Sequence, residues 1–236
     1  MKYLTRLFAT LLFIFIIIVS TRVNAFAMNT GFTTEEASEQ TINNIINKTP
    51  ISILTEEPAK KTIDHFDVNQ YGMIAIVQSV PDIKTICVYT KSGEFKYAYR
   101  FKCDGSVGVE WDDNTLMIYL VRESVAFTVN SNGEIEHIVG IANTIENNSY
   151  WNHSVFANKR VIDNTEYRLN NDRGIFNLFA SSYTQLVVTE NNGEESIIYD
   201  VNSSQIVKDI ATFILIVILI FIAIYYIRKE FIKLKQ

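Results

Sequence analysis

An uncharged apolar run near the C-terminus constrains this chain more than any other feature. The run covers the 18 residues Ile210–Ile227, and thirteen of them are Ile, Leu, Val or Phe. At about −0.4 kcal/mol for each of these thirteen residues, insertion into a bilayer is favoured by roughly 5 kcal/mol. A core helix of similar length in a soluble protein normally shows a polar stripe, and this run shows none. The sequence therefore predicts one transmembrane helix over residues 210–227, surrounded by bilayer lipid.

The charges on either side of the run predict its orientation. Asp209 precedes the run, whereas the tail 228–236 carries four Lys or Arg residues against one Glu. Lys and Arg residues beside a transmembrane helix are retained in the cytoplasm, and Tyr225 and Tyr226 lie where aromatic side chains meet the headgroups. We therefore expect a single-pass protein of the cell membrane, with a cytoplasmic tail at 228–236 and the bulk of the chain extracytoplasmic.

The N-terminal end has the three parts of a secretory signal peptide. Lys2 and Arg6 precede a 13-residue apolar run at 7–19, and small residues follow up to Ala25. As a helix, this run covers only about 20 Å, which is short of the hydrocarbon core of about 30 Å. Cleavage after Ala25 or after Ala27 fits the pattern, and an uncleaved signal anchor is the alternative. Both readings place the following segment outside the cytoplasm.

A short helical stretch and a β-rich domain lie between the two ends. Thr34, followed by acidic residues, predicts a capped helix, and Pro50 and Pro58 interrupt the stretch after it. From about residue 63 the pattern changes to alternating apolar and polar residues with regularly spaced turns. The expected organisation is a signal peptide at 1–25, a short helix and linker at 26–62, an extracytoplasmic β domain at 63–205, the transmembrane helix at 210–227 and the tail at 228–236.

Antiparallel hairpins account for the alternation. Residues 94–101 alternate as a half-buried strand should, and a two-residue turn at Ser92-Gly93 pairs Tyr97 with Val88. A second hairpin turns at Ser131-Asn132-Gly133 and places His137 on its apolar face, so we expect this histidine to pack in the core.

Two stretches of the β domain resemble blades of a β-propeller. The first is carried by Phe66-Asp67-Val68, Ile74-Ala75-Ile76, Val88-Tyr89 and Ser92-Gly93-Glu94-Phe95, and the second by Val109 to Ile138. They are similar to NHL-type six-bladed repeats, in which blades ring a central channel and usually serve as binding platforms. About 140 residues at 40–45 per blade allow three or four blades, near or below the number that closes a ring.

The expected fold class is therefore all-β, with three to four antiparallel meanders or propeller-like blades that form an open or incomplete propeller, a stacked meander, or a ring closed by oligomerisation. Its Ile- and Asn-rich composition makes the chain similar to small single-span proteins of low-GC Gram-positive bacteria.

Charge and motif content restrict the kinds of partner and cofactor that this chain is expected to bind. Residues 28–209 hold 14 of the 21 basic and 25 of the 26 acidic residues, and so carry about −11, which argues against nucleic acid. No phosphate-binding glycine loop, nucleophile elbow or metal-ligand spacing occurs, so no cofactor is expected. The two cysteines, Cys87 and Cys103, are not cross-strand neighbours, and a disulfide between them would need the chain to curl back.

Candidate recognition residues are four large aromatics and two acids of predicted loops. Such aromatics more often pack in a sheet core, and Asp- and Asn-rich loops are the usual composition of β-turns. The acidic loops also lack the spacing of a calcium-binding loop. The candidates are Trp111, Tyr150, Trp151, Tyr167, Asp112 and Asp172.

Three functional hypotheses follow. The first is an extracytoplasmic binding or interaction module of unknown ligand, with a protein partner in the envelope, as an accessory of an envelope complex. The second is a membrane-tethered hydrolase of envelope polymers, with carboxylates from Asp112, Asp163 or Asp172 paired about 5–9 Å apart in a groove. The third is a structural stalk without a ligand, which predicts a surface with no sizeable concave pocket.

Overall fold

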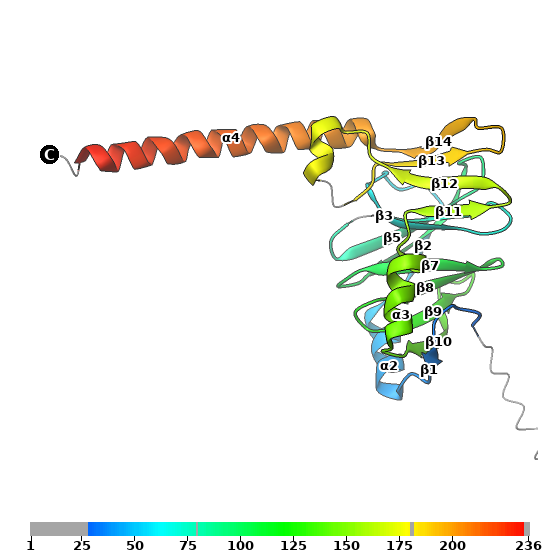
Figure 1. Ribbon diagram of the computed structural model, residues 1–236. Helices are drawn as coiled ribbons and strands as arrows, with labels where there is room; N and C mark the ends of the chain where they lie inside the picture. The colour runs from blue at the N-terminus through cyan, green and yellow to red at the C-terminus, as the bar shows by residue number, and fades with distance from the viewer. Residues whose placement is uncertain (1–27, 79, 180–181, 234–236) are drawn as a thin grey trace, which may run out of the picture.

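Three antiparallel sheets and a long C-terminal helix make up the structure, a computed structural model that describes residues 28–78, 80–179 and 182–233 (Figure 1). The predicted signal peptide, residues 1–25, lies outside the described residues. Each sheet contains a meander of four strands that follow one another in the sequence. The expectation of antiparallel β meanders is confirmed, and within the described residues none of the three sheets closes into a ring.

Strand β4 shows why the first meander lies in the middle of the molecule. β4 (Ile74–Gln78) is buried along its whole length. Ala75 and Val77 join the core shared with the second meander, and Ile74 and Ile76 join the core shared with the third. A strand buried on both faces needs such a continuous apolar run. The spatial order of this sheet is β2 (Ser52–Leu54), β6 (Phe95–Lys102), β5 (Ile83–Tyr89), β4 and β3 (Ile63–Val68).

The second and third sheets pack on opposite faces of the middle sheet, so that the three form layers (Figure 1). The second sheet contains, in spatial order, β1 (Thr34–Glu35), β10 (Ile135–Ile141), β9 (Val125–Val129), β8 (Thr115–Leu120) and β7 (Val107–Asp112). The third contains β11 (Lys159–Ile162), β12 (Thr165–Asn170), β13 (Gln185–Thr189) and β14 (Glu195–Asp200). The first strands of the meanders converge, because β3 contacts both β7 and β11.

The predicted register of the β5–β6 hairpin is confirmed, since Tyr97 pairs with Val88. The predicted two-residue turn is wrong. The backbone N–H groups of Thr90 and Gly93 donate to the carbonyls of Glu94 and Thr90 respectively, so the loop is three residues long. Gly93 has a φ of 82°, which this bulged turn requires and which glycine adopts without strain.

The β9–β10 hairpin keeps its predicted register only near the turn. Ile135 pairs with Val129, but a bulge between Glu136 and Val139 shifts the remaining pairs by one residue. His137 lies in this bulge with a φ of 50° and is exposed. The expectation that His137 packs in the core is therefore wrong, because the bulge turns it away from the buried face.

The segment before the first meander completes two sheets. Thr34, expected to start a helix, belongs instead to β1 and pairs with Ile141 of β10. The helix itself, α2 (Glu39–Lys48), begins later, and Ser38 caps it by accepting a hydrogen bond from the backbone N–H of Thr41. β2 pairs with β6 at the edge of the middle sheet. Both edge strands therefore come from the stretch expected as helix and linker.

The cysteines do not form a disulfide, because they lie on opposite faces of the middle sheet. Cys87 joins the core shared with the third sheet, and Cys103 joins the core shared with the second. Burial raises the pKa of the Cys87 thiol to about 12 and that of Cys103 to about 11, so both stay protonated.

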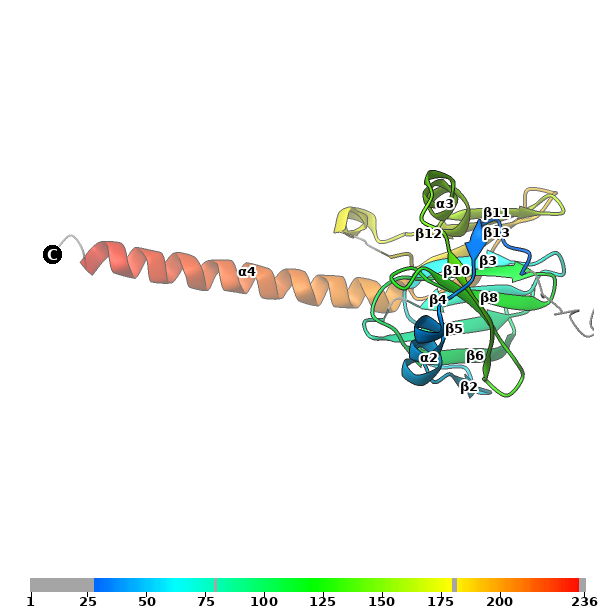
Figure 2. The same cartoon turned by 90° about the horizontal axis from the view of Figure 1, so that it is seen from below.

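Helix α4 (Asn202–Lys233) follows β14 after one residue and extends away from one end of the strands (Figures 1 and 2). Its part Asn202–Arg228 is long and apolar enough to cross a membrane, with a mean hydropathy of 3.0 in its most apolar window and none of that window buried. The prediction of one apolar helix at 210–227 is confirmed.

Candidate functional site

A buried ion pair joins the converging first strands of the three meanders. Arg160 Nε, on β11, donates to Asp67 Oδ1, on β3, over 2.7 Å. Asp67 Oδ2 accepts the backbone N–H of Trp111, on β7, over 2.8 Å. The side chains of Arg160 and Asp67 are only 14% and 12% exposed. The other N–H groups of Arg160 donate to the backbone carbonyls of Val155, Ala157 and Lys159.

His65 lies beside this ion pair, two residues before Asp67 on the same strand. It is 1% exposed, and its Nε2 donates to the backbone carbonyl of Val109 over 3.1 Å. Phe156 packs edge-on against its ring. Burial lowers the pKa of His65 to about 3, so the imidazole is neutral at physiological pH.

Glu110 is a half-buried acid on the outer face of β7. Its Oε2 accepts from the Tyr119 hydroxyl and its Oε1 from the Tyr150 hydroxyl, each over 2.7 Å. Burial raises the pKa of Glu110, while these two hydrogen bonds act in the opposite direction. The acid thereby fastens α3 (Ile145–Tyr150) to the second sheet. A lone Glu in an alternating strand normally faces solvent, so the sequence carries no signal for this role.

These groups hold the sheets and α3 together, and they are too enclosed for a substrate to reach them. Asp67 and Glu110 line none of the described hollows. Within the part of the chain that the structure describes, no three His, Cys, Asp or Glu side chains gather as metal ligands would. A buried, fully hydrogen-bonded ion pair instead specifies how the elements that it joins are oriented.

The four aromatic candidates are distributed through the cores. Tyr167 is 1% exposed between the middle and third sheets. Trp151, in η1 (Trp151–Val155), packs against Phe32 and Tyr119 on the outer face of the second sheet, next to Tyr150. Trp111 is half-buried, and its indole Nε1 is buried without a hydrogen-bond partner among the described atoms. These residues do not form one continuous recognition surface.

The two acidic candidates lie at opposite ends of the strands. Asp172 is exposed near the root of α4, and its backbone carbonyl accepts from the Asn202 side chain over 2.6 Å. Asp112 ends β7 at the other end of the domain, beside a turn that Asn69 and Gln70 hold by hydrogen bonds to Asp113. The two acids therefore cannot act in one groove.

Asp112 lines a hollow of about 280 Å³ on the outer face of the second sheet, which Met28, Met117 and Val129 also line. α3 and η1 cover the half of this face nearer α4, and the hollow occupies the uncovered half. We call it the distal hollow, because it lies at the end of the strands away from α4. Its polar lining consists of Asp112, Thr115, Thr128, Asn130, Glu136 and His137.

The bulge in β10 brings His137 to this hollow. Glu136 pairs with Thr128 across the strands, and the shift that follows gives His137 its left-handed backbone. Such bulges re-aim side chains and occur beside binding and catalytic sites. Two carboxylates, an imidazole and two hydroxyls in this lining can bind a ligand through hydrogen bonds and charge. The Asn130 amide is instead occupied by hydrogen bonds to Asn132, Glu134 and Glu136. Among these residues, sequence reasoning identified only Asp112 as a recognition candidate.

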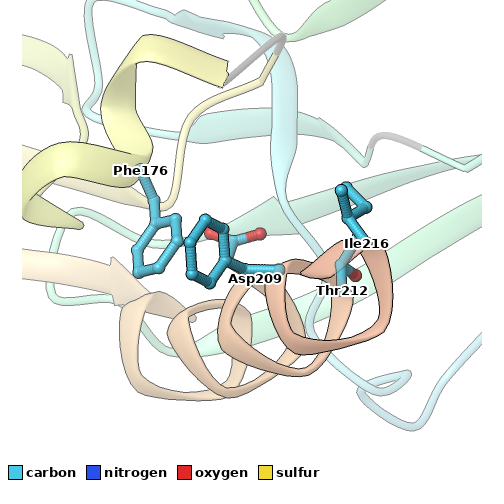
Figure 3. Close-up of a pocket in the computed structure, with 5 residues that line it drawn as sticks. Phe176, Asp209, Thr212 and Ile216 are labelled. Atoms are coloured by element: carbon cyan, nitrogen blue, oxygen red, sulfur yellow. The ribbon is translucent and has the colours of Figure 1, made fainter. Parts of the chain in front are cut away.

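A second hollow, of about 300 Å³, lies at the root of α4 (Figure 3). Phe176, of the 3₁₀ helix η2 (Gly174–Phe179), faces Asp209, Thr212, Phe213 and Ile216 of α4. The Phe176 and Phe213 rings meet edge-on, with centroids 6.4 Å apart. This second hollow is more strongly apolar than the distal hollow.

An ion pair links the first turns of α4 to the domain. Arg173 Nη1 donates to Asp209 Oδ2 over 2.9 Å, and the Arg173 side chain is 4% exposed. Asp209 Oδ1 also accepts from the Gln205 amide over 3.0 Å. These contacts hold η2 and the first turns of α4 together.

Neither a protein-family model nor a curated protein matches this chain, so the proposals about its function depend on the geometry of these sites.

Proposed function

We propose that this chain is a membrane-anchored binding module, which holds its β-rich domain outside the cytoplasm on a single transmembrane helix. The uncharged run Ile210–Ile227, exposed along α4, supports the anchor. The acidic domain before it and the basic tail after it support an extracytoplasmic domain and a cytoplasmic C-terminus.

The distal hollow is the observation that carries the binding role. Because it lies at the end of the strands away from α4, it faces away from the membrane when α4 spans the bilayer. Asp112 and Glu136 give it two negative charges, and the Thr115 hydroxyl can both donate and accept. The Thr128 hydroxyl donates to the Glu136 carbonyl and can still accept. We infer a polar ligand of the envelope that carries hydroxyl or cationic groups. The charged and hydroxyl-bearing lining, more than the volume, favours binding over a purely structural stalk.

A ligand-binding assay on the full-length protein in lipid nanodiscs tests the distal hollow. The probes are a neutral N-acetylglucosamine tetrasaccharide and the polyamine spermine. We expect binding of at least one probe, and a loss of about tenfold or more in the double variant Asp112→Asn/Glu136→Gln. The matched control, Asp163→Asn/Glu194→Gln, changes two acids of other distal turns. Equal loss in both double variants, or no binding of either probe, contradicts the proposed ligand class.

A hydrolase acting on envelope polymers is the second candidate, because Asp112 and Glu136 line the same hollow. The two carboxylates would serve as general acid and as base or nucleophile. Of the three acids expected to supply them, Asp112 alone lines this hollow, and Asp172 lies at the other end of the domain. Release of reducing ends from an N-acetylglucosamine polymer, abolished by Asp112→Asn, would support hydrolysis. Binding without release supports the module.

We also propose that the three meanders correspond to propeller-type blades in an incomplete ring. Each has four consecutive antiparallel strands. The first strands of the three meanders meet, since β3 contacts both β7 and β11. An exposed platform of this kind would suit a protein partner in an envelope complex. Cross-linking of the tagged full-length protein in its own membranes, followed by capture, tests for that partner.

A further inference from the structure

We propose that η2 inserts into the outer leaflet of the membrane and contacts lipid acyl chains, so that the domain is held at the bilayer by a second attachment beside α4. We call η2, with its exposed Ile175, the membrane foot. The inference rests on the proposed function, because it requires α4 to span the bilayer.

The length of the apolar run determines the depth of the foot. Eighteen helical residues cover about 27 Å, slightly less than the hydrocarbon core of about 30 Å. The run therefore has no spare length, and Ile210 must lie at the outer boundary of the hydrocarbon. Phe213 and Ile216 then lie about 4–5 Å and about 9 Å deeper along the helix. Phe176 packs on Phe213 and shares a hollow with both residues, which places the foot below the headgroups (Figure 3).

The composition of the foot suits this depth. Its sequence, Gly-Ile-Phe-Asn-Leu-Phe, holds four large apolar residues and no charge. Ile175 is 73% exposed, and nothing in the described structure covers it. A large apolar side chain at the depth of a transmembrane helix is covered by lipid, and its transfer from water is favourable.

Most side-chain polar groups around the foot are paired, and Arg173 Nε is the exception among the described atoms. Asn177 Oδ1 accepts the backbone N–H of Arg173 over 3.1 Å, and its Nδ2 donates to the carbonyl of Asn171 over 3.2 Å. The Arg173 and Asp209 charges neutralise each other at the boundary. Polar groups near hydrocarbon must find partners within the protein, and the Asn177 amide and the Asp209 carboxylate do.

Spin labels on single cysteines measure the depth of the foot. The full-length variant Ile175→Cys is labelled and reconstituted in vesicles of equal parts phosphatidylethanolamine and phosphatidylglycerol. Collision rates with oxygen, which partitions into lipid, and with a water-soluble nickel chelate then report its surroundings. Cys87 and Cys103 are 0% and 8% exposed and stay unlabelled in the folded protein.

Three matched positions make the outcome interpretable. Leu219→Cys lies in the middle of the run, while Val161→Cys and Tyr71→Cys replace exposed apolar residues of the domain that are 57% and 62% exposed. We expect the labels at positions 175 and 219 to collide more with oxygen, and the other two more with the chelate. A water-exposed label at 175 beside a lipid-exposed label at 219 overturns the foot alone. A water-exposed label at 219 overturns the transmembrane anchor.

Discussion

His65 should make the stability of the domain depend on pH between 7 and 5. Burial lowers the pKa of the folded-state imidazole to about 3, whereas the unfolded chain has the ordinary value of about 6.5. Below pH 6.5 the unfolded state therefore binds a proton that the folded state does not. The contribution is fully present above pH 6.5 and is lost as the pH falls toward 3.

The folded-state and unfolded-state pKa values of His65 set how much the free energy of unfolding changes with pH. At pH 5 the protonated form of the unfolded imidazole outnumbers the neutral form by about thirty to one. This lowers the free energy of unfolding by about 2 kcal/mol relative to pH 7. Asp67 and Glu110 act in the opposite direction, because burial raises the pKa of each carboxyl in the folded state. The effect of His65 is therefore isolated by comparison with a variant, and not by the wild-type curve alone.

His65→Gln is the matched change, since glutamine keeps a donor for the Val109 carbonyl and does not titrate. Urea unfolding of both full-length proteins in nanodiscs, followed by tryptophan fluorescence at pH 7 and pH 5, gives the two pH differences. We expect the wild-type protein to lose about 2 kcal/mol more than the variant on acidification. Equal losses within about 0.5 kcal/mol would refute the inference that buried His65 stays neutral.

Two further predictions concern the buried groups. Asp67→Asn leaves the Arg160 guanidinium buried without its counter-charge and should lower the free energy of unfolding by about 3–5 kcal/mol. Glu166→Gln, which removes the surface ion pairs with Lys159 and Arg168, should change it by less than about 1 kcal/mol. Similar urea midpoints for the two variants would count against the buried pair. Cys87 and Cys103 should both react with a thiol reagent after unfolding without reductant, and neither should react quickly in the native protein; an oxidised, intramolecularly linked species on mass spectrometry would contradict their placement on opposite faces.

Local features of the chain were predictable from the sequence alone. The apolar helix follows from composition, because membrane insertion depends on the hydropathy of one continuous segment. The β5–β6 register follows from alternation, because a shift by one residue would turn every apolar side chain to the wrong face. In each case the deciding interactions lie within one segment or between two adjacent strands.

The tertiary structure alone decided how distant segments meet. Asp67 and Arg160 are 93 residues apart, and their pairing depends on which faces of three sheets pack together. The edge strands β1 and β2 are short and gain their pairing only from completed meanders. The bulge at His137, which brings an imidazole to the distal hollow, also leaves no mark in the alternation of the strand. The contact between η2 and α4, which the proposed membrane foot requires, is a further case. Long-range packing determines these features, since the free energy that selects them comes from surfaces that are not neighbours in the chain.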